Sequence, residues 1–153
     1  MRPGDFPIPF ASSGSYPVRA GNRLRPLIDG EPAYQRICEA VEAAQHSVWL
    51  TVAWIWDSFR LPGGRGSLFD LLDAASARGL DVRVMFYRHT AEGAFPRHIV
   101  FQVTPEQRLW LEGRGSRFFA RWDSTPVWSF HHQKSWMIDA GHDSEIAFVG
   151  GMN

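Results

Sequence analysis

Hydrophobic positions along the chain follow two spacings, one helical and one typical of strands. Apolar residues recur every three to four positions in three segments, which predicts helices over 32–44, 67–79 and 104–112. Runs rich in β-branched and aromatic residues predict strands over 47–55, 81–87, 116–122, 129–139 and 146–149. The last two strands flank a turn over 140–145, which indicates a hairpin. This order predicts an α/β fold, a mixed β-sheet flanked by helices.

The first 26 residues show no such period and are rich in Pro, Gly and Ser, so we expect an irregular arm at 1–26 and one domain over 27–153. No apolar run reaches the roughly 18 residues of a membrane-spanning helix. The opening residues do not read as a signal peptide. We therefore expect a cytoplasmic protein, and peripheral contact with a membrane stays open.

Composition narrows the classes of function. The chain has 16 basic and 16 acidic residues, which argues against a general nucleic-acid binder. Four arginines, Arg108, Arg114, Arg117 and Arg121, lie close together and are expected on a solvated surface. Cys38 is the single cysteine, so an internal disulfide and a Cys-based metal site are excluded within one chain, and we expect a buried thiol.

The chemistry is concentrated between Ser129 and Asn153. On a strand, His132 and Lys134 project from the same face, and an imidazole beside an ammonium suits an anionic substrate. The positive charge should favour a neutral His132 that is able to attack, while Lys134 neutralises an anionic oxygen. Asp139 is seven positions from His132, so an unbroken strand places it on the opposite face as a turn-anchoring carboxylate. A bend near Met137 would reverse that placement.

Two glycines follow the last predicted strand, at Gly150 and Gly151, where the backbone can turn and approach a ligand closely. The amide of Asn153 can donate an N–H to a phosphate oxygen. His132, Lys134 and Asn153 converging from neighbouring strands predict a phosphoryl cradle.

This pattern resembles the HKD motif of the phospholipase D superfamily, with His132-Gln133-Lys134, Asp139 and Gly150-Gly151-Met152-Asn153 in its positions. The segment GNRLRPLIDGEPAYQRICEAVEAAQHSVWLTVAWI is also similar to the opening helix and strand of bacterial members, so the resemblance covers most of the chain from about Tyr16. It implies a phosphohistidine intermediate without a metal or other cofactor. His132 would be the nucleophile or its acid/base partner, Lys134 and Asn153 the phosphate clamps, and Asp139 a supporting residue.

The chain departs from the family in carrying a single HKD motif and in stopping at Asn153. The resemblance therefore implies a partial domain, the first HKD half, that is inactive alone and completed by a missing second half or a homodimer partner. The leading hypothesis is cleavage or transfer of phosphatidyl groups, as in cardiolipin synthase-like members. A nuclease of the same superfamily and a non-catalytic module that binds anionic headgroups are the alternatives.

Several other residues could have either a structural or a functional role. By alternation His131 faces away from Lys134 and is expected to be packed or on the surface. We do not expect a metal site from His131, His132, Asp139, His142 and Asp143. His89 and His98 are expected on the surface. Core packing and a substrate entrance explain the following set equally well: Trp54, Trp56, Asp57 and Phe59.

Overall fold

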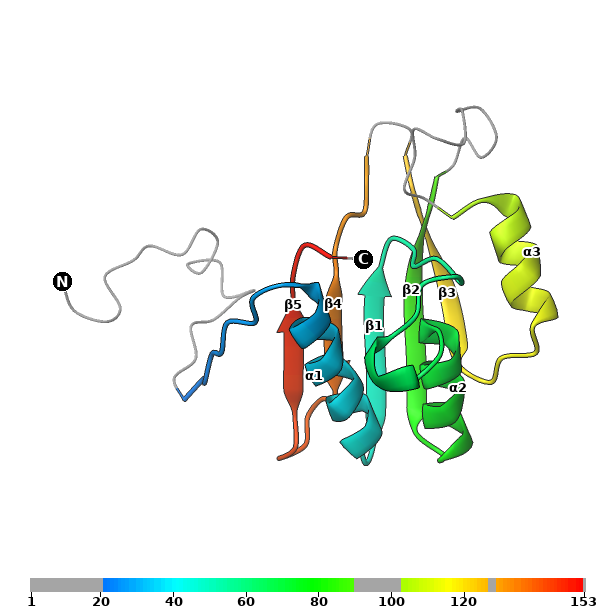
Figure 1. Ribbon diagram of the computed structural model, residues 1–153. Helices are drawn as coiled ribbons and strands as arrows, with labels where there is room; N and C mark the ends of the chain where they lie inside the picture. The colour runs from blue at the N-terminus through cyan, green and yellow to red at the C-terminus, as the bar shows by residue number, and fades with distance from the viewer. Residues whose placement is uncertain (1–20, 90–102, 127–128, 153) are drawn as a thin grey trace.

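The structure, a computed structural model, describes residues 21–89, 103–126 and 129–152. Its elements in chain order are α1 (Gly30–Ala43), β1 (Ser47–Val52), the 3-10 turn η2 (Pro62–Gly64), α2 (Leu68–Ala77), β2 (Asp81–His89), α3 (Pro105–Gly113), β3 (Phe119–Thr125), β4 (Ser135–Ile138) and β5 (Ile146–Val149) (Figure 1). Residues 21–28 form neither helix nor strand, and residues 1–20 of the arm predicted over 1–26 lie outside the described residues.

Within the described residues, the strands form one five-stranded sheet in the order β3-β2-β1-β4-β5. The β1, β2 and β3 strands are parallel, and α2 and α3 supply the crossovers that parallel strands need. The β4 strand runs antiparallel to β1, and β5 runs antiparallel to β4. The predictions of a mixed α/β sheet and of a C-terminal hairpin are confirmed.

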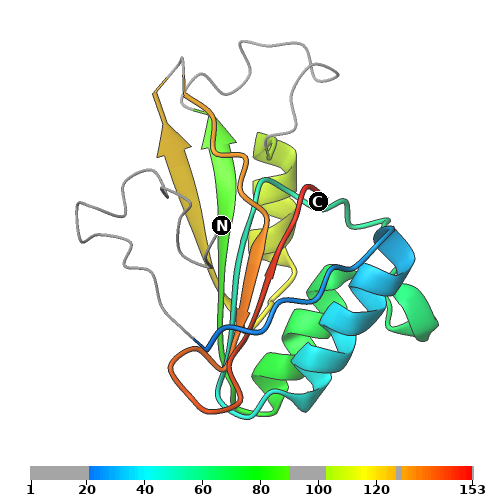
Figure 2. The same cartoon turned by 90° about the vertical axis from the view of Figure 1, so that its left-hand side faces the viewer.

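The core lies between the sheet and the helices, which Figure 2 shows on one side of the sheet. Alternate strand residues point toward the helices and are almost fully buried: Val48, Leu50 and Val52 of β1, and Val82, Val84 and Phe86 of β2. Full burial of such a side chain contributes about 1.5–3 kcal/mol. Cys38 belongs to this core, as predicted. Residues of the opposite sheet face stay largely exposed, among them Trp49, Met85, Phe119 and Met137.

The start of α2 is fixed by a side-chain cap. Ser67 accepts a hydrogen bond from the Asp70 N–H, and the Asp70 carboxylate accepts one from the Ser67 N–H. These two reciprocal bonds form a capping box. The bonds from Ser67 lower the pKa of Asp70 to about 2, with a smaller effect of Arg114.

Two predicted strands differ from the structure. The third strand begins at Phe119 and not at 116, because the Ser116 hydroxyl and the Arg117 N–H donate hydrogen bonds to Asp73 of α2. The strand predicted over 129–139 is wrong in its first half, since β4 begins only at Ser135. Within the described residues, no helix combines the length and the apolar character that crossing a membrane requires.

A candidate phosphate-binding site at the carboxyl edge of the sheet

One edge of the sheet gathers the segments that carry the predicted chemistry. The β1, β2, β3 and β5 strands all end there, and antiparallel β4 starts there (Figure 1). The segment 129–134 approaches this edge before entering β4. In open α/β sheets, ligands bind outside the carboxyl ends of the strands.

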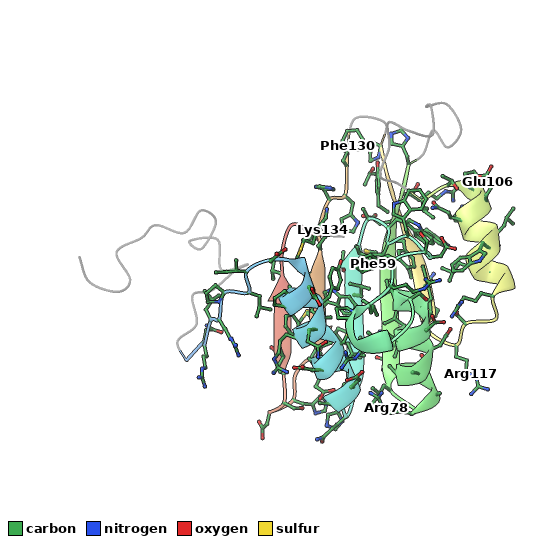
Figure 3. All side chains as sticks on the ribbon, viewed as in Figure 1. Phe59, Arg78, Glu106, Arg117, Phe130 and Lys134 are labelled. Carbon is green, nitrogen blue, oxygen red and sulfur yellow. The ribbon has the colours of Figure 1, made fainter. Side chains whose placement is uncertain are left out.

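The segment 129–134 is held by side chains and not by a strand ladder. The Ser129 carbonyl accepts hydrogen bonds from the Thr125 hydroxyl at 2.6 Å and from the Tyr87 hydroxyl at 3.3 Å. The Ser129 N–H donates to the Pro126 carbonyl. These bonds, the one from Tyr87 being long-range in the sequence, replace the sheet pairing that the alternation predicted. Figure 3 shows Phe130 at the top of the segment and Lys134 lower down, where β4 begins.

Lys134, the single lysine of the chain, is buried at 6% exposure. Its Nζ donates to the His132 carbonyl at 3.3 Å, and among the described residues no carboxylate forms an ion pair with it. Burial lowers the pKa of Lys134, because it removes water from around the ammonium. A buried ammonium without a counter-ion is costly, and an anion placed beside it would relieve that cost.

His132 occupies the middle of this segment with an exposed side chain. His132 and Lys134 therefore do not share the strand face that the sequence predicted. Neither residue lies in β4, and His132 is exposed whereas Lys134 is buried. The two residues are joined instead through the bond from the Lys134 ammonium to the His132 carbonyl.

The hairpin places Gly150 beside Lys134. The Gly150 N–H donates to the Lys134 carbonyl at 3.2 Å, continuing the pairing of Ser135 with Val149. Neither Gly150 nor Gly151 has a positive φ, and an added Cβ would meet no atom within 4 Å at either position. The expected tight glycine turn is therefore not required by this backbone. Asn153 lies outside the described residues.

Asp139 lies at the other end of β4, five residues or roughly 16 Å from Lys134 along an extended chain. Its buried carboxylate accepts hydrogen bonds from the N–H groups of Gln45, His46 and Ser47, and from the Ser144 hydroxyl. Burial alone would raise the pKa of Asp139, but these donors outweigh it and lower the pKa to about 2. Asp139 thus anchors the turn after β4 to the start of β1. This is the structural role expected for it, although the unbroken strand on which that expectation was based is not present.

A group of polar and aromatic residues, whose association the sequence does not indicate, lies beneath segment 129–134. His89 was expected on the surface but is fully buried at the end of β2, edge-on to Tyr87. His131 is buried at 9% exposure, and its Nδ1 lies 3.1 Å from the Asp123 carboxylate of β3. Alternation places Tyr87 and His89 on the face away from the core. The segment packed over that face is what buries them, and no local pattern shows it.

A pocket of about 590 Å³ opens between the start of α1, the loop around η2 and the chain after β5. It is lined by Gly30, Glu31, Tyr34, Phe59, Arg60, Pro62 and Met152. Burial raises the pKa of Tyr34 to about 12, so its phenol stays neutral. Figure 3 shows Phe59 and Lys134 both toward the carboxyl edge.

The aromatic residues that follow β1 have different environments. Trp54 is a core residue, packed against Phe69 and Phe86. Phe59 lines the pocket, where its ring contacts Tyr34 at 5.1 Å between centroids. Trp56 is 66% exposed and does not line it.

The remaining candidates lie elsewhere. His142 stacks on His46 at 3.7 Å, at the end of the sheet opposite Lys134. In the part of the chain that the structure describes, no three metal-ligating side chains come together. Of the four arginines, Arg114 pairs with Asp70 and Asp73, whereas Arg117 and Arg121 are exposed as expected. His98 lies outside the described residues.

Comparison with known proteins gives one informative similarity. No family model matches the chain. The chain is 26% identical over 145 residues to Phospholipase D B of Dictyostelium discoideum, a match that covers 89% of this chain. The same match covers 11% of that protein, so the chain spans about a ninth of the length of this curated relative. Together with the partial α/β domain, the similarity supports a place in the phospholipase D superfamily.

Proposed function

We propose that this chain provides one half of the active site of a phospholipase D-type phosphodiesterase. The observation that carries the proposal is the buried Lys134 ammonium, which has no carboxylate partner among the described residues and is directly joined to the segment that presents the His132 side chain. A phosphodiester has the charge that this site lacks. The similarity to Phospholipase D B points in the same direction.

In the proposed reaction an imidazole nitrogen of His132 attacks phosphorus. A P–N bond forms as the P–O bond to the leaving alcohol breaks, and the Lys134 ammonium stabilises the charge on the phosphate oxygens. The leaving oxygen takes a proton from a second histidine. That histidine then removes a proton from water or an alcohol, whose oxygen attacks phosphorus. A new P–O bond forms as the P–N bond breaks, and His132 is released. Asn153 is the expected second phosphate clamp.

The second histidine comes, in this proposal, from a second HKD motif in another part of a longer chain or in a homodimer partner. His132 is the exposed histidine of the site, and His131 and His89 beside it are buried. This chain alone therefore binds a phosphodiester without turning it over efficiently. Neither a metal nor an organic cofactor enters the proposed reaction.

The pocket beside the site favours a phospholipid over a nucleic acid as substrate. Tyr34, Phe59, Pro62 and Met152 give it an apolar lining, and its two charged residues, Glu31 and Arg60, are of opposite sign, so the pocket has no excess of positive charge for a polyanionic strand. An apolar substituent of the phosphodiester fits this lining. Contact with a membrane surface would then be peripheral. The nuclease and the non-catalytic headgroup-binding module remain the alternatives that the experiment below separates.

The first experiment uses the single lysine as a probe. In a chain with isotope-labelled lysine, dimethyl phosphate should shift the Lys134 NMR signal in a saturable way. The same titration of Lys134→Met, followed on the His132 ring, should show no saturable binding. His142→Gln, which changes an exposed histidine at the opposite end of the sheet, should bind as the unaltered chain does. Absence of binding by the unaltered chain would overturn the proposal.

The second experiment tests the chemistry. A radiolabelled phosphatidyl donor, with the longer protein or a mixture that supplies the second motif, should leave an acid-labile phosphohistidine on His132. His132→Asn should abolish the adduct, whereas His142→Gln should retain it. Binding without any adduct would favour the headgroup-binding module. Faster turnover of DNA than of phospholipid would favour the nuclease.

A further inference from the structure

The segment that carries His132 needs an anchor that the sheet does not provide. It is fixed at Ser129 by Thr125 and Tyr87, and at Lys134 by the Gly150 N–H. Between these two points, His131 is the buried side chain that points into the molecule next to exposed His132. Whatever holds His131 therefore also sets the position of His132.

The environment of His131 is polar on one side and aromatic on the other. Its Nδ1 lies 3.1 Å from Asp123 Oδ2, within ion-pair distance, although neither ring nitrogen makes a hydrogen bond to any described residue. The Tyr87 ring lies edge-on to it, with centroids 6.4 Å apart. A buried imidazole with two unsatisfied nitrogens is unfavourable, and a nearby carboxylate offsets that cost when the imidazole is protonated.

Register explains why Asp123 is in reach. Asp123 of β3 is paired with Tyr87 of β2, so the carboxylate and the phenol stand side by side at the carboxyl edge. Both act on one short stretch: Tyr87 on the Ser129 carbonyl and Asp123 on the His131 ring. His89 is the further titratable group beside Tyr87 on β2.

We propose that Asp123 and His131 form a positioning pair, which holds segment 129–134 so that His132 and Lys134 face the same phosphate. This inference rests on the proposed function and adds two residues to its site. Neither residue touches the substrate in this arrangement. The pair acts by raising the fraction of molecules whose segment is ready to bind, and apparent affinity scales with that fraction.

Dimethyl phosphate binding, followed on the His132 ring signals, tests the pair. Asp123→Asn and His131→Phe should each weaken binding about tenfold, and the double variant should weaken it no further, because both changes break one contact. His131→Phe keeps a ring against Tyr87, so packing alone predicts unaltered binding for it. Asp143→Asn, an exposed carboxylate in the turn before β5, is the matched control and should bind normally.

A spectroscopic measurement separates positioning from general destabilisation. Without any anion, Asp123→Asn should shift or broaden the His132 ring signals while leaving those of His142 unchanged. Unaltered binding by His131→Phe, or multiplying effects in the double variant, would overturn the pair. If the unaltered chain binds no dimethyl phosphate, the proposed function fails. The pair is then judged by the His132 signals alone, and unchanged signals in Asp123→Asn would overturn it too.

Discussion

Replacing Asp139 by Asn tests whether this carboxylate supports the fold or the chemistry. Its oxygens accept hydrogen bonds from three consecutive backbone N–H groups of residues 45–47 and from the Ser144 hydroxyl. Asn is the suitable substitution because Asp139 has φ 51°, a left-handed conformation that Asn tolerates well. Any loss of stability then reflects the lost charge and not backbone strain.

The magnitude follows from the pKa. A fall from the ordinary value of 3.8 to about 2 corresponds to about 2 kcal/mol of stabilisation at neutral pH, at about 1.4 kcal/mol per pH unit. Because the pKa of the folded state is the lower one, this contribution is fully present above about pH 4. It is lost as the pH falls from there toward 2. Asp139→Asn should therefore be about 2 kcal/mol less stable at pH 7, with a smaller difference in acid.

Urea denaturation followed by tryptophan fluorescence, at pH 7 and at pH 3, measures both values. Asp143→Asn, in the same turn but exposed, should change the free energy of unfolding by less than about 0.5 kcal/mol. Dimethyl phosphate should bind folded Asp139→Asn with ordinary affinity. A variant of full stability that fails to bind phosphate would refute the reasoning and return Asp139 to the catalytic group.

Four further predictions concern other parts of the structure. Ser67→Ala removes the capping box of α2 and should destabilise the chain by about 1 kcal/mol in urea denaturation. Lys134→Met should raise the melting temperature while abolishing phosphate binding, because it removes a buried charge that no carboxylate of the described residues neutralises. An NMR pH titration of Lys134 should show its pKa below 10.5, rising when dimethyl phosphate binds, and unliganded stability should increase as pH rises through that interval. Met137→Gln, on the exposed sheet face, should change the free energy of unfolding by less than about 0.5 kcal/mol.

Local pattern was sufficient to predict most of the fold. The α2 helix follows from Ser67, Asp70 and the apolar spacing after them, and the hairpin follows from a short turn between two apolar runs. The α/β class needed no more than the order of these elements. Strand ends were less predictable. Trp54 and Ile55 are as apolar and buried as β1 itself, yet the ladder ends at Val52.

The site was predictable in its residue types but not in its geometry. The sequence predicts one strand over 129–139, and on such a strand His132 and Lys134 would lie on a common face of the sheet. In the structure, the Ser129 carbonyl is bound by side chains of Thr125 and Tyr87, and regular pairing starts only at Ser135. The bond from Tyr87 joins residues that are far apart in the sequence, so it produces no repeating pattern of hydrophobic and polar residues that could predict it.

The irregular path of this segment has a chemical consequence. A strand would expose His132 and Lys134 equally, whereas the observed backbone buries the ammonium and leaves the imidazole exposed. A nucleophile must reach phosphorus, which requires exposure. An ammonium acts most strongly on phosphate charge where water is excluded, because a lower dielectric increases the interaction. The bonds from Thr125 and Tyr87 to the Ser129 carbonyl, which break the strand pattern, therefore give each residue the environment that its proposed role requires.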